Sequence, residues 1–282
     1  YGLVDDAWSA FVADRLHLAA VTATVEAIAA DEDDLAVWQR LGGVVTAIDH
    51  HLDQHQKPAA AARFIALATA ALDRVGAEPV PGEDQRTAQL RATLFKLAGV
   101  LGHPPTVALA QRLVTDGADP ERLSAAISVV AANGGPAEFD AFVAAYKGAT
   151  TPQEERRYLF ALADFNGSGE NSRLLAMIDD DEIRSQDAAY VLGRSMANSE
   201  SGPSVWRHVA ANWDGLNDRL PHNAIPPMIS GVTALAEPDL AHDISSFFRE
   251  HPVPQAGKTL DQHLERLRVN VEVRARVRFQ AG

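Results

Sequence analysis

Residues 182–213 read EIRSQDAAYVLGRSMANSESGPSVWRHVAANW, and this stretch decides the fold that we expect for the whole chain. Apolar residues recur in both halves at the three- and four-residue spacing of a helix. Between them, residues 198–203 are turn formers, and Pro203 suits the first turn of a following helix. The stretch therefore predicts a helical hairpin. Its apolar stripes are Ile183, Ala188, Val191 and Leu192, then Val205, Trp206, Val209, Ala210 and Trp213.

The same helical period runs through nearly all of the 282 residues. The cleanest stripe consists of Trp38, Leu41, Val45, Ile48 and Leu52, and further helices are expected near residues 228–235 and 238–250. Helices of roughly 10–20 residues, paired about every 40 residues, are typical of stacked hairpins. The sequence thus predicts an all-α superhelical array of antiparallel helix pairs, a HEAT- or armadillo-like α-solenoid. No linker is long or polar enough to divide it, so we expect residues 1–282 to form a single domain.

The last segment gives two conflicting signals. From Leu267 to Phe279 apolar and polar residues alternate strictly, which is the pattern of a half-buried strand. Leu260, Leu264, Leu267 and Val271 also hold helical spacing. We expect a helix, because a lone strand would have no partner in an otherwise helical chain.

Composition narrows the classes of function. The net charge of −13 disfavours nucleic-acid binding, which needs clustered Lys and Arg. No apolar run approaches the roughly 20 residues of a membrane span. The chain has no cysteine, which excludes disulfides and thiolate metal sites within it and is compatible with a reducing compartment, so we expect a cytoplasmic protein. Because it begins at Tyr1 without Met or a leader, we expect a fragment of a larger multidomain protein.

Residues 49–55 contain the strongest candidate metal motif in the sequence. His51 and His55 stand at i and i+4, a spacing that lets two imidazoles bind one zinc ion from one helix face. A zinc peptidase motif, H-E-x-x-H, has a catalytic glutamate where this sequence has Leu52. A solvated polar helix end is the favoured interpretation, and metal binding by the two histidines is a weaker alternative. We therefore predict no catalytic residue and no metal ligand in this chain.

Several blocks, in this order, resemble the C-terminal helical domain of zinc aminopeptidases of the aminopeptidase N type, a family that includes puromycin-sensitive and endoplasmic-reticulum aminopeptidases. The resemblance covers essentially the whole chain. Its blocks are residues 2–7, Trp38, Gly82-Glu83-Asp84 with Leu90-Arg91, residues 131–135, Phe139, Tyr146, residues 154–157, residues 159–162, residues 183–187, Asn198, Trp206, Asn212-Trp213, Phe247-Phe248, residues 252–254 and residues 264–266.

The resemblance implies a non-catalytic role. The zinc motif of this family and its G-A-M-E-N substrate motif lie in earlier domains and are absent here. The zinc would therefore belong to the parent enzyme, which removes N-terminal residues from peptides. The partners implied are the catalytic domain of the same polypeptide and peptide substrates. This domain would enclose the chamber over the active site and help to select peptides.

Two residues are candidates for substrate contact. By resemblance, residues 184–187 lie near the chamber wall, where Arg184 would attract a peptide carboxylate and Gln186 would bond to the peptide backbone. The alternative is that Asp187 caps or pairs locally and Arg184 is a surface charge. A different function also stays open, that of a free-standing helical-repeat scaffold that binds a protein partner.

Overall fold

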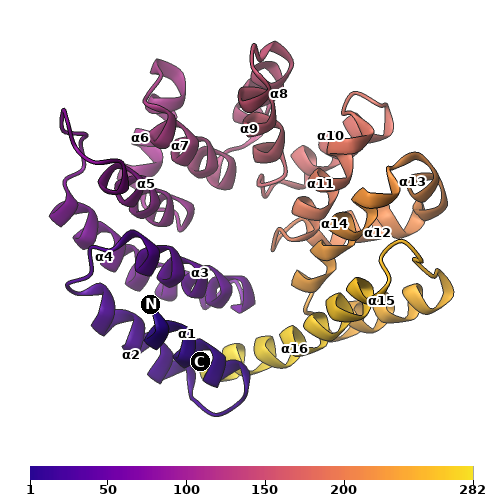
Figure 1. Cartoon of the computed structure of the whole chain (residues 1–282), viewed down its shortest axis with the longest axis horizontal. Coiled ribbons are helices and arrows are strands. Elements are labelled where there is room, and N and C mark those ends of the chain that lie inside the picture. Colours follow the sequence, from indigo (N-terminus) through magenta and orange to yellow (C-terminus); the bar gives the residue numbers. More distant parts are fainter. Residues whose placement is uncertain (282) are drawn as a thin grey trace. The chain divides into compact units, whose positions relative to one another are not determined.

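The computed structural model describes residues 1–281, which form sixteen α-helices and two 3₁₀ helices and contain no strand (Figure 1). The all-α prediction is confirmed. No helix within these residues combines the length and the apolar character needed to cross a membrane. The elements are α1 (Gly2–Val12), α2 (Leu18–Ala29), α3 (Leu35–His51), α4 (Lys57–Val75), α5 (Gln85–Val100), α6 (Pro104–Asp116), α7 (Pro120–Asn133), α8 (Pro136–Gly148), α9 (Pro152–Leu162), α10 (Ser168–Asp179), α11 (Ser185–Met196), α12 (Gly202–Ala211), α13 (Trp213–Arg219), η1 (His222–Ala224), α14 (Ile225–Ile229), η2 (Ser230–Ala234), α15 (Pro238–Glu250) and α16 (Lys258–Gln280).

The chain divides into two compact units. Unit 1 comprises residues 1–130 together with the end of the chain from Val273, and unit 2 comprises residues 131–272. Within each unit, successive helices pack as pairs, for example α1 with α2, α4 with α5, and α8 with α9. Alternate helices also stack: α1, α3 and α5 form one row and α2 and α4 another, while α9 packs on α11 and α8 on α10. These two rows are the pattern of an α-solenoid, as the sequence predicts.

Helix α3 supplies the core of unit 1. All five residues of the predicted stripe from Trp38 to Leu52 are buried, at 3% exposure or less. Asp34 begins the helix by accepting hydrogen bonds from the backbone N–H groups of Ala36 at 2.8 Å and Val37 at 3.2 Å. Capping at one end and an apolar stripe along one side together explain why this segment is a helix.

In unit 2, the predicted hairpin is formed by α11 and α12. Its second helix is shorter than predicted, because α12 ends at Ala211 and Trp213 begins α13. Both Trp206 and Trp213 are nevertheless buried, and their rings lie 5.2–5.6 Å from those of Phe247 and Phe248 in α15. This aromatic cluster ties the hairpin to α15.

The segment after α13 departs from the single helix expected near residues 228–235. In that range the chain forms the end of α14 and then η2, and the short η1 precedes α14. The physical reason is a backbone-to-backbone contact with α11, where a Cβ on Gly231 would lie 2.3 Å from the carbonyl oxygen of Gly193. Two glycines permit this approach, which any larger residue would prevent.

The last segment, α16, is a helix, so the prediction for this ambiguous stretch is confirmed. Leu267, Val273 and Val277 are buried at 1% exposure or less. The alternating pattern is explained by Arg274, Arg276 and Arg278, which we call the arginine clasp. Since residues two positions apart on a helix point about 200° apart, Arg274 and Arg278 share one side and Arg276 takes the other.

The two sides of the arginine clasp reach different helix ends within unit 1. Arg274 Nη1 and Arg278 Nε donate to the carbonyl oxygens of His50 and His51, at 3.1 and 3.3 Å, in the last turn of α3. Arg276 Nη2 donates to the carbonyl oxygen of Val12, the last residue of α1, at 2.7 Å. Cations are favourable at helix C-termini, where carbonyl groups lack intrahelical partners.

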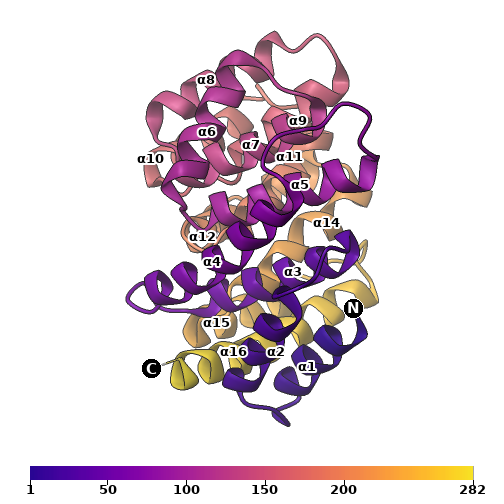
Figure 2. The ribbon, with the colours of Figure 1, turned by 90° about the vertical axis from the view of Figure 1, so that its left-hand side faces the viewer.

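Two glutamines complete this junction. The side-chain oxygen of Gln280 accepts a hydrogen bond of 2.7 Å from the N–H of Leu18, the first residue of α2. The side-chain amide of Gln56 donates to the carbonyl oxygen of Arg278 at 2.9 Å. The yellow end of α16 lies by α1 in Figure 1 and by α2 in Figure 2. The end of the chain is therefore part of the N-terminal unit.

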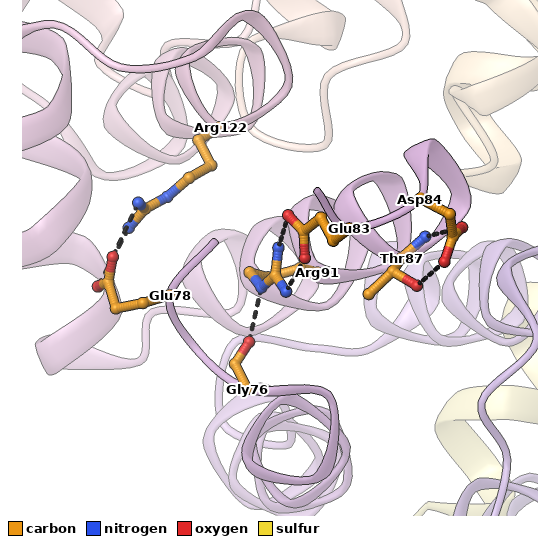
Figure 3. Close-up of polar contacts among 7 residues, drawn as sticks. All are labelled: Gly76, Glu78, Glu83, Asp84, Thr87, Arg91 and Arg122. Atoms are coloured by element: carbon orange, nitrogen blue, oxygen red, sulfur yellow. Dashed lines mark hydrogen bonds and ion pairs between the residues drawn. The ribbon is translucent and has the colours of Figure 1, made fainter. Parts of the chain in front are cut away.

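The loop between α4 and α5 is held by a buried ion pair (Figure 3). Arg91 is 3% exposed and makes two bonds to the carboxylate of Glu83, at 2.8 and 2.6 Å. Its Nε also donates to the carbonyl oxygen of Gly76 at 2.6 Å, and Gly76 itself has a φ of +88°. Hydrogen bonding to Arg91 holds the pKa of Glu83 below its ordinary value. Asp84 beside it caps α5 through the N–H of Thr87 at 3.0 Å.

We predict that Arg91→Ala lowers the free energy of unfolding by about 3 kcal/mol, because it leaves a carboxylate and a carbonyl without their shared donor. Urea unfolding monitored by circular dichroism measures the change. The matched control is Arg86→Ala, which removes an exposed pair with Asp34 and should cost under about 1 kcal/mol. Equal losses in the two variants would contradict the assignment.

We predict that Arg276→Met lowers the free energy of unfolding by about 2 kcal/mol, since a charged hydrogen bond to a helix end is lost. Arg268→Met is the control, because Arg268 bonds only to Glu265 and Glu272 of its own exposed helix face. Exchange of the backbone amide hydrogens at the end of α1 should also accelerate in Arg276→Met and stay unchanged in Arg268→Met. Unchanged exchange there would show that the clasp does not hold α1.

Candidate functional site

The predicted contact residue Arg184 lies immediately before α11. Its carbonyl oxygen accepts hydrogen bonds from the N–H groups of Asp187 and Ala188, at 2.9 and 2.8 Å, which begins the helix. Its side chain is 71% exposed, and Nη2 lies 2.7 Å from Oε1 of Glu155 in α9. The guanidinium is thus in solvent but already has a carboxylate partner.

Gln186 lies in the first turn of α11 and is exposed. Within residues 1–281 its side-chain amide has no hydrogen-bond partner. One donor group and one acceptor group are therefore available to a ligand. Asp187 likewise makes no side-chain hydrogen bond or ion pair in this part of the chain, so the local capping considered as an alternative is not formed.

A second ion pair and a buried phenol lie beside Arg184. Lys147 Nζ lies 2.5 Å from Glu182 Oε2, and the Tyr146 hydroxyl donates to the Glu182 carbonyl oxygen at 3.4 Å. Burial raises the pKa of Tyr146, and the negative charge of Glu155 adds to the shift, so the phenol stays protonated. We call these residues, with Arg184, Glu155 and Gln186, the Arg184 cluster.

The Arg184 cluster is suited to binding and not to catalysis. Its cations are neutralised by carboxylates, and it offers no nucleophile with an activating base. The exposed amide of Gln186 is the group of this cluster whose hydrogen-bonding capacity is unused within residues 1–281. Sequence reasoning named Arg184 and Gln186 but missed Glu155, 29 positions away, because no periodic pattern links α9 to the start of α11.

The two candidate metal ligands of the sequence are not brought onto one helix face. Helix α3 ends at His51, Leu52 is extended, and His55 lies exposed in the turn before α4. Among the residues that the structure describes, no three His, Cys, Asp or Glu side chains form a group that could hold a metal ion. The expectation of a solvated helix end is correct for His55 but wrong for His51, which is 5% exposed.

His51 is buried at the end of α3, where Arg274 and Arg278 donate to the carbonyl oxygens of His50 and His51. Among the residues that the structure describes, its Nδ1 has no hydrogen-bond partner. Burial lowers the pKa of His51 to about 3, and the positive charges of His50, Arg274 and Arg278 contribute further. The imidazole is therefore neutral at pH 7.

Comparison with known proteins identifies related chains. The sequence model of the ERAP1-like C-terminal domain matches residues 1–269. Aminopeptidase M1-C of Oryza sativa subsp. japonica is 26% identical over 95% of this chain and 32% of its own length. Aminopeptidase M1 of Arabidopsis thaliana is 24% identical over 96% of this chain and 32% of its own length. Glutamyl aminopeptidase of Sus scrofa is 29% identical over 45% of this chain and 14% of its own length.

The chain spans about a third of the length of the plant relatives that it matches. The matched region is the C-terminal part of those proteins. The residues of this chain therefore correspond to a C-terminal domain of aminopeptidases.

His51 should make stability depend on pH. The folded-state pKa of about 3 lies below the ordinary value of 6.5, so between these values only the unfolded chain binds the proton. We predict that the free energy of unfolding falls by about 1.4 kcal/mol for each pH unit below 6.5, and that His51→Gln removes this slope. Urea unfolding at a series of pH values measures it. His55→Gln is the exposed control and should keep the slope; the same slope in the His51 variant would contradict the assignment.

Proposed function

Because the chain belongs to the ERAP1-like C-terminal domain family, we propose that it is the non-catalytic C-terminal part of a zinc aminopeptidase, a longer polypeptide that removes N-terminal residues from peptides. The observation that carries the proposal is the family match over residues 1–269. The relatives, each about three times as long, support it, since their names assign them aminopeptidase activity. Because this sequence contains no H-E-x-x-H motif, the proposal places the zinc site in another part of the longer polypeptide.

The role proposed for this domain is to enclose the chamber over the active site and to contact the peptide beyond its N-terminus. Enclosure excludes water and folded proteins from the reaction. The free amide of Gln186 and the exposed guanidinium of Arg184 support a contact with peptides. The partners are then the catalytic part of the same polypeptide and the peptide substrate. We propose that both compact units act as one domain, since the family match runs across them, and that the protein is cytoplasmic.

The test of this proposal is hydrolysis of an aminoacyl chromogenic substrate. We predict none by residues 1–282 alone, and zinc-dependent hydrolysis by the polypeptide that includes the upstream sequence. Zinc-dependent activity from residues 1–282 would overturn the assignment. An open reading frame that begins at Tyr1, without an upstream H-E-x-x-H motif, would favour the scaffold alternative.

In that longer polypeptide, Gln186→Ala should raise KM for a peptide about three- to tenfold, since one or two hydrogen bonds to the substrate are lost. A single-residue chromogenic substrate does not extend to the domain, so its KM should not change. The control is Gln111→Ala, an exposed glutamine on α6. An equal effect on both substrates would argue against a contact beyond the N-terminus.

A further inference from the structure

One helix of the chain is anchored in both compact units. Helix α16 begins in unit 2, where the side-chain amide of Asn270 donates to the carbonyl oxygen of Thr233 at 2.7 Å. From Val273 onwards it belongs to unit 1, and there Arg274 donates to the carbonyl oxygen of His50 at 3.1 Å. The two anchoring side chains are four residues apart, which is about one helical turn. The helix thus passes from one unit to the other within a single turn.

Helix α7 makes the other passage between the units, at residues 130–131. On the unit 1 side, Val129 packs so closely on α5 that a Cβ on Gly99 would lie 2.5 Å from its side chain. On the unit 2 side, the carbonyl oxygen of Ala132 accepts a hydrogen bond of 2.8 Å from the side-chain amide of Asn166. Unfolding of either unit therefore also disrupts a helix that the other unit holds.

The end of α16 contacts several helix ends of unit 1. Residues 273–281, which we call the strap, include the arginine clasp, whose donors reach the last carbonyl groups of α1 and α3. The strap also contains Gln280, which accepts a hydrogen bond of 2.7 Å from the N–H of Leu18 at the start of α2. Val277 of the strap is fully buried, at 0% exposure. These hydrogen bonds join residues that are 224–264 positions apart in the sequence.

Contacts over such sequence distances change what is expected of a helical array. In an α-solenoid each helix pair contacts mainly its neighbours, so a terminal pair can open while the other pairs stay folded. In this chain, opening of α1 and α2 also breaks hydrogen bonds to the strap, and the strap continues a helix that is anchored in unit 2. The stability of the first helices is therefore linked to unit 2 through α16.

We propose that the strap couples the two compact units, so that the chain unfolds as one cooperative unit and release of the strap lets unit 1 open by itself. The strap is then a conformational device that decides whether unit 1 opens alone. The inference deepens one point of the proposed function, on which it rests, namely that both units act as one domain.

Buried thiols are a specific probe of this opening, because the chain has no cysteine of its own. Val44 in α3 of unit 1 and Val209 in α12 of unit 2 are both at 0% exposure. Two full 282-residue chains carry Val44→Cys or Val209→Cys, and the rate of labelling by a thiol reagent is measured at a series of urea concentrations. When closing is faster than labelling, this rate reports the population of the open form. With the strap intact, we expect both thiols to show the same dependence on urea and rates that agree within about threefold.

The strap is weakened by Arg276→Gln together with Arg278→Gln, which removes hydrogen bonds to the ends of α1 and α3. In this background the thiol of unit 1 should be labelled at least about tenfold faster than the thiol of unit 2 at the same urea concentration. The matched control is Arg266→Gln together with Arg268→Gln. It makes the same change of charge at exposed positions on the part of α16 that belongs to unit 2, and the two rates should stay equal.

Gln280→Ala is a milder strap variant, which stays informative if the double substitution unfolds the chain. It removes only the hydrogen bond to α2, and it should accelerate labelling in unit 1 about two- to tenfold relative to unit 2. Unequal rates with the intact strap would mean that the units already open separately, and equal rates in the strap variants would mean that α7 alone couples them. Either result would overturn the proposal.

The labelling experiment does not read hydrolysis, so its outcome is distinguishable from that of the activity test. Coupled opening in a chain without an aminopeptidase parent would keep the strap and remove the proposed function. Separate opening in the domain of an active aminopeptidase would keep the proposed function and remove the strap.

Discussion

The interaction on which the rest of the structure depends is the contact of the arginine clasp with the ends of α1 and α3. The last carbonyl groups of a helix have no partner within it, and burying them without one is unfavourable. Here the donors come from residues 224–264 positions away in the sequence. The N-terminal unit therefore includes the last helical turns of α16. Burial, with the nearby charges of His50, Arg274 and Arg278, lowers the pKa of His51 and keeps it neutral at pH 7.

At other helix ends, too, a side chain from another segment donates a hydrogen bond to one of the last carbonyl groups. Arg74 of α4 donates to the carbonyl oxygen of Ala29 at the end of α2, at 3.0 Å. Arg91 donates to the carbonyl oxygen of Gly76, which follows α4. Arg219 donates to the carbonyl oxygen of Ile178 at the end of α10, at 3.1 Å. In each case a neighbouring segment supplies a cation where the helix dipole is negative. In this acidic protein, many arginines thus connect one helix to the next, and few remain for a ligand.

The functional proposals concern polar groups that this packing does not use. Gln186 has a free amide, and Arg184 is exposed although paired with Glu155. The Arg184 cluster has no nucleophile with an activating base, and its exposed amide at Gln186 offers one donor group and one acceptor group for a hydrogen-bonding ligand.

The sequence by itself determined the helical class, the buried stripe of α3 and the hairpin of α11 and α12, because apolar periodicity reports which face of a helix is buried. It also identified the related family and named Arg184 and Gln186. Only the tertiary structure decided that Arg184 pairs with Glu155, that His51 is buried, that residues 222–234 break into short helices, and that α16 joins the N-terminal unit. These depend on contacts between segments distant in the chain, which local periodicity does not encode.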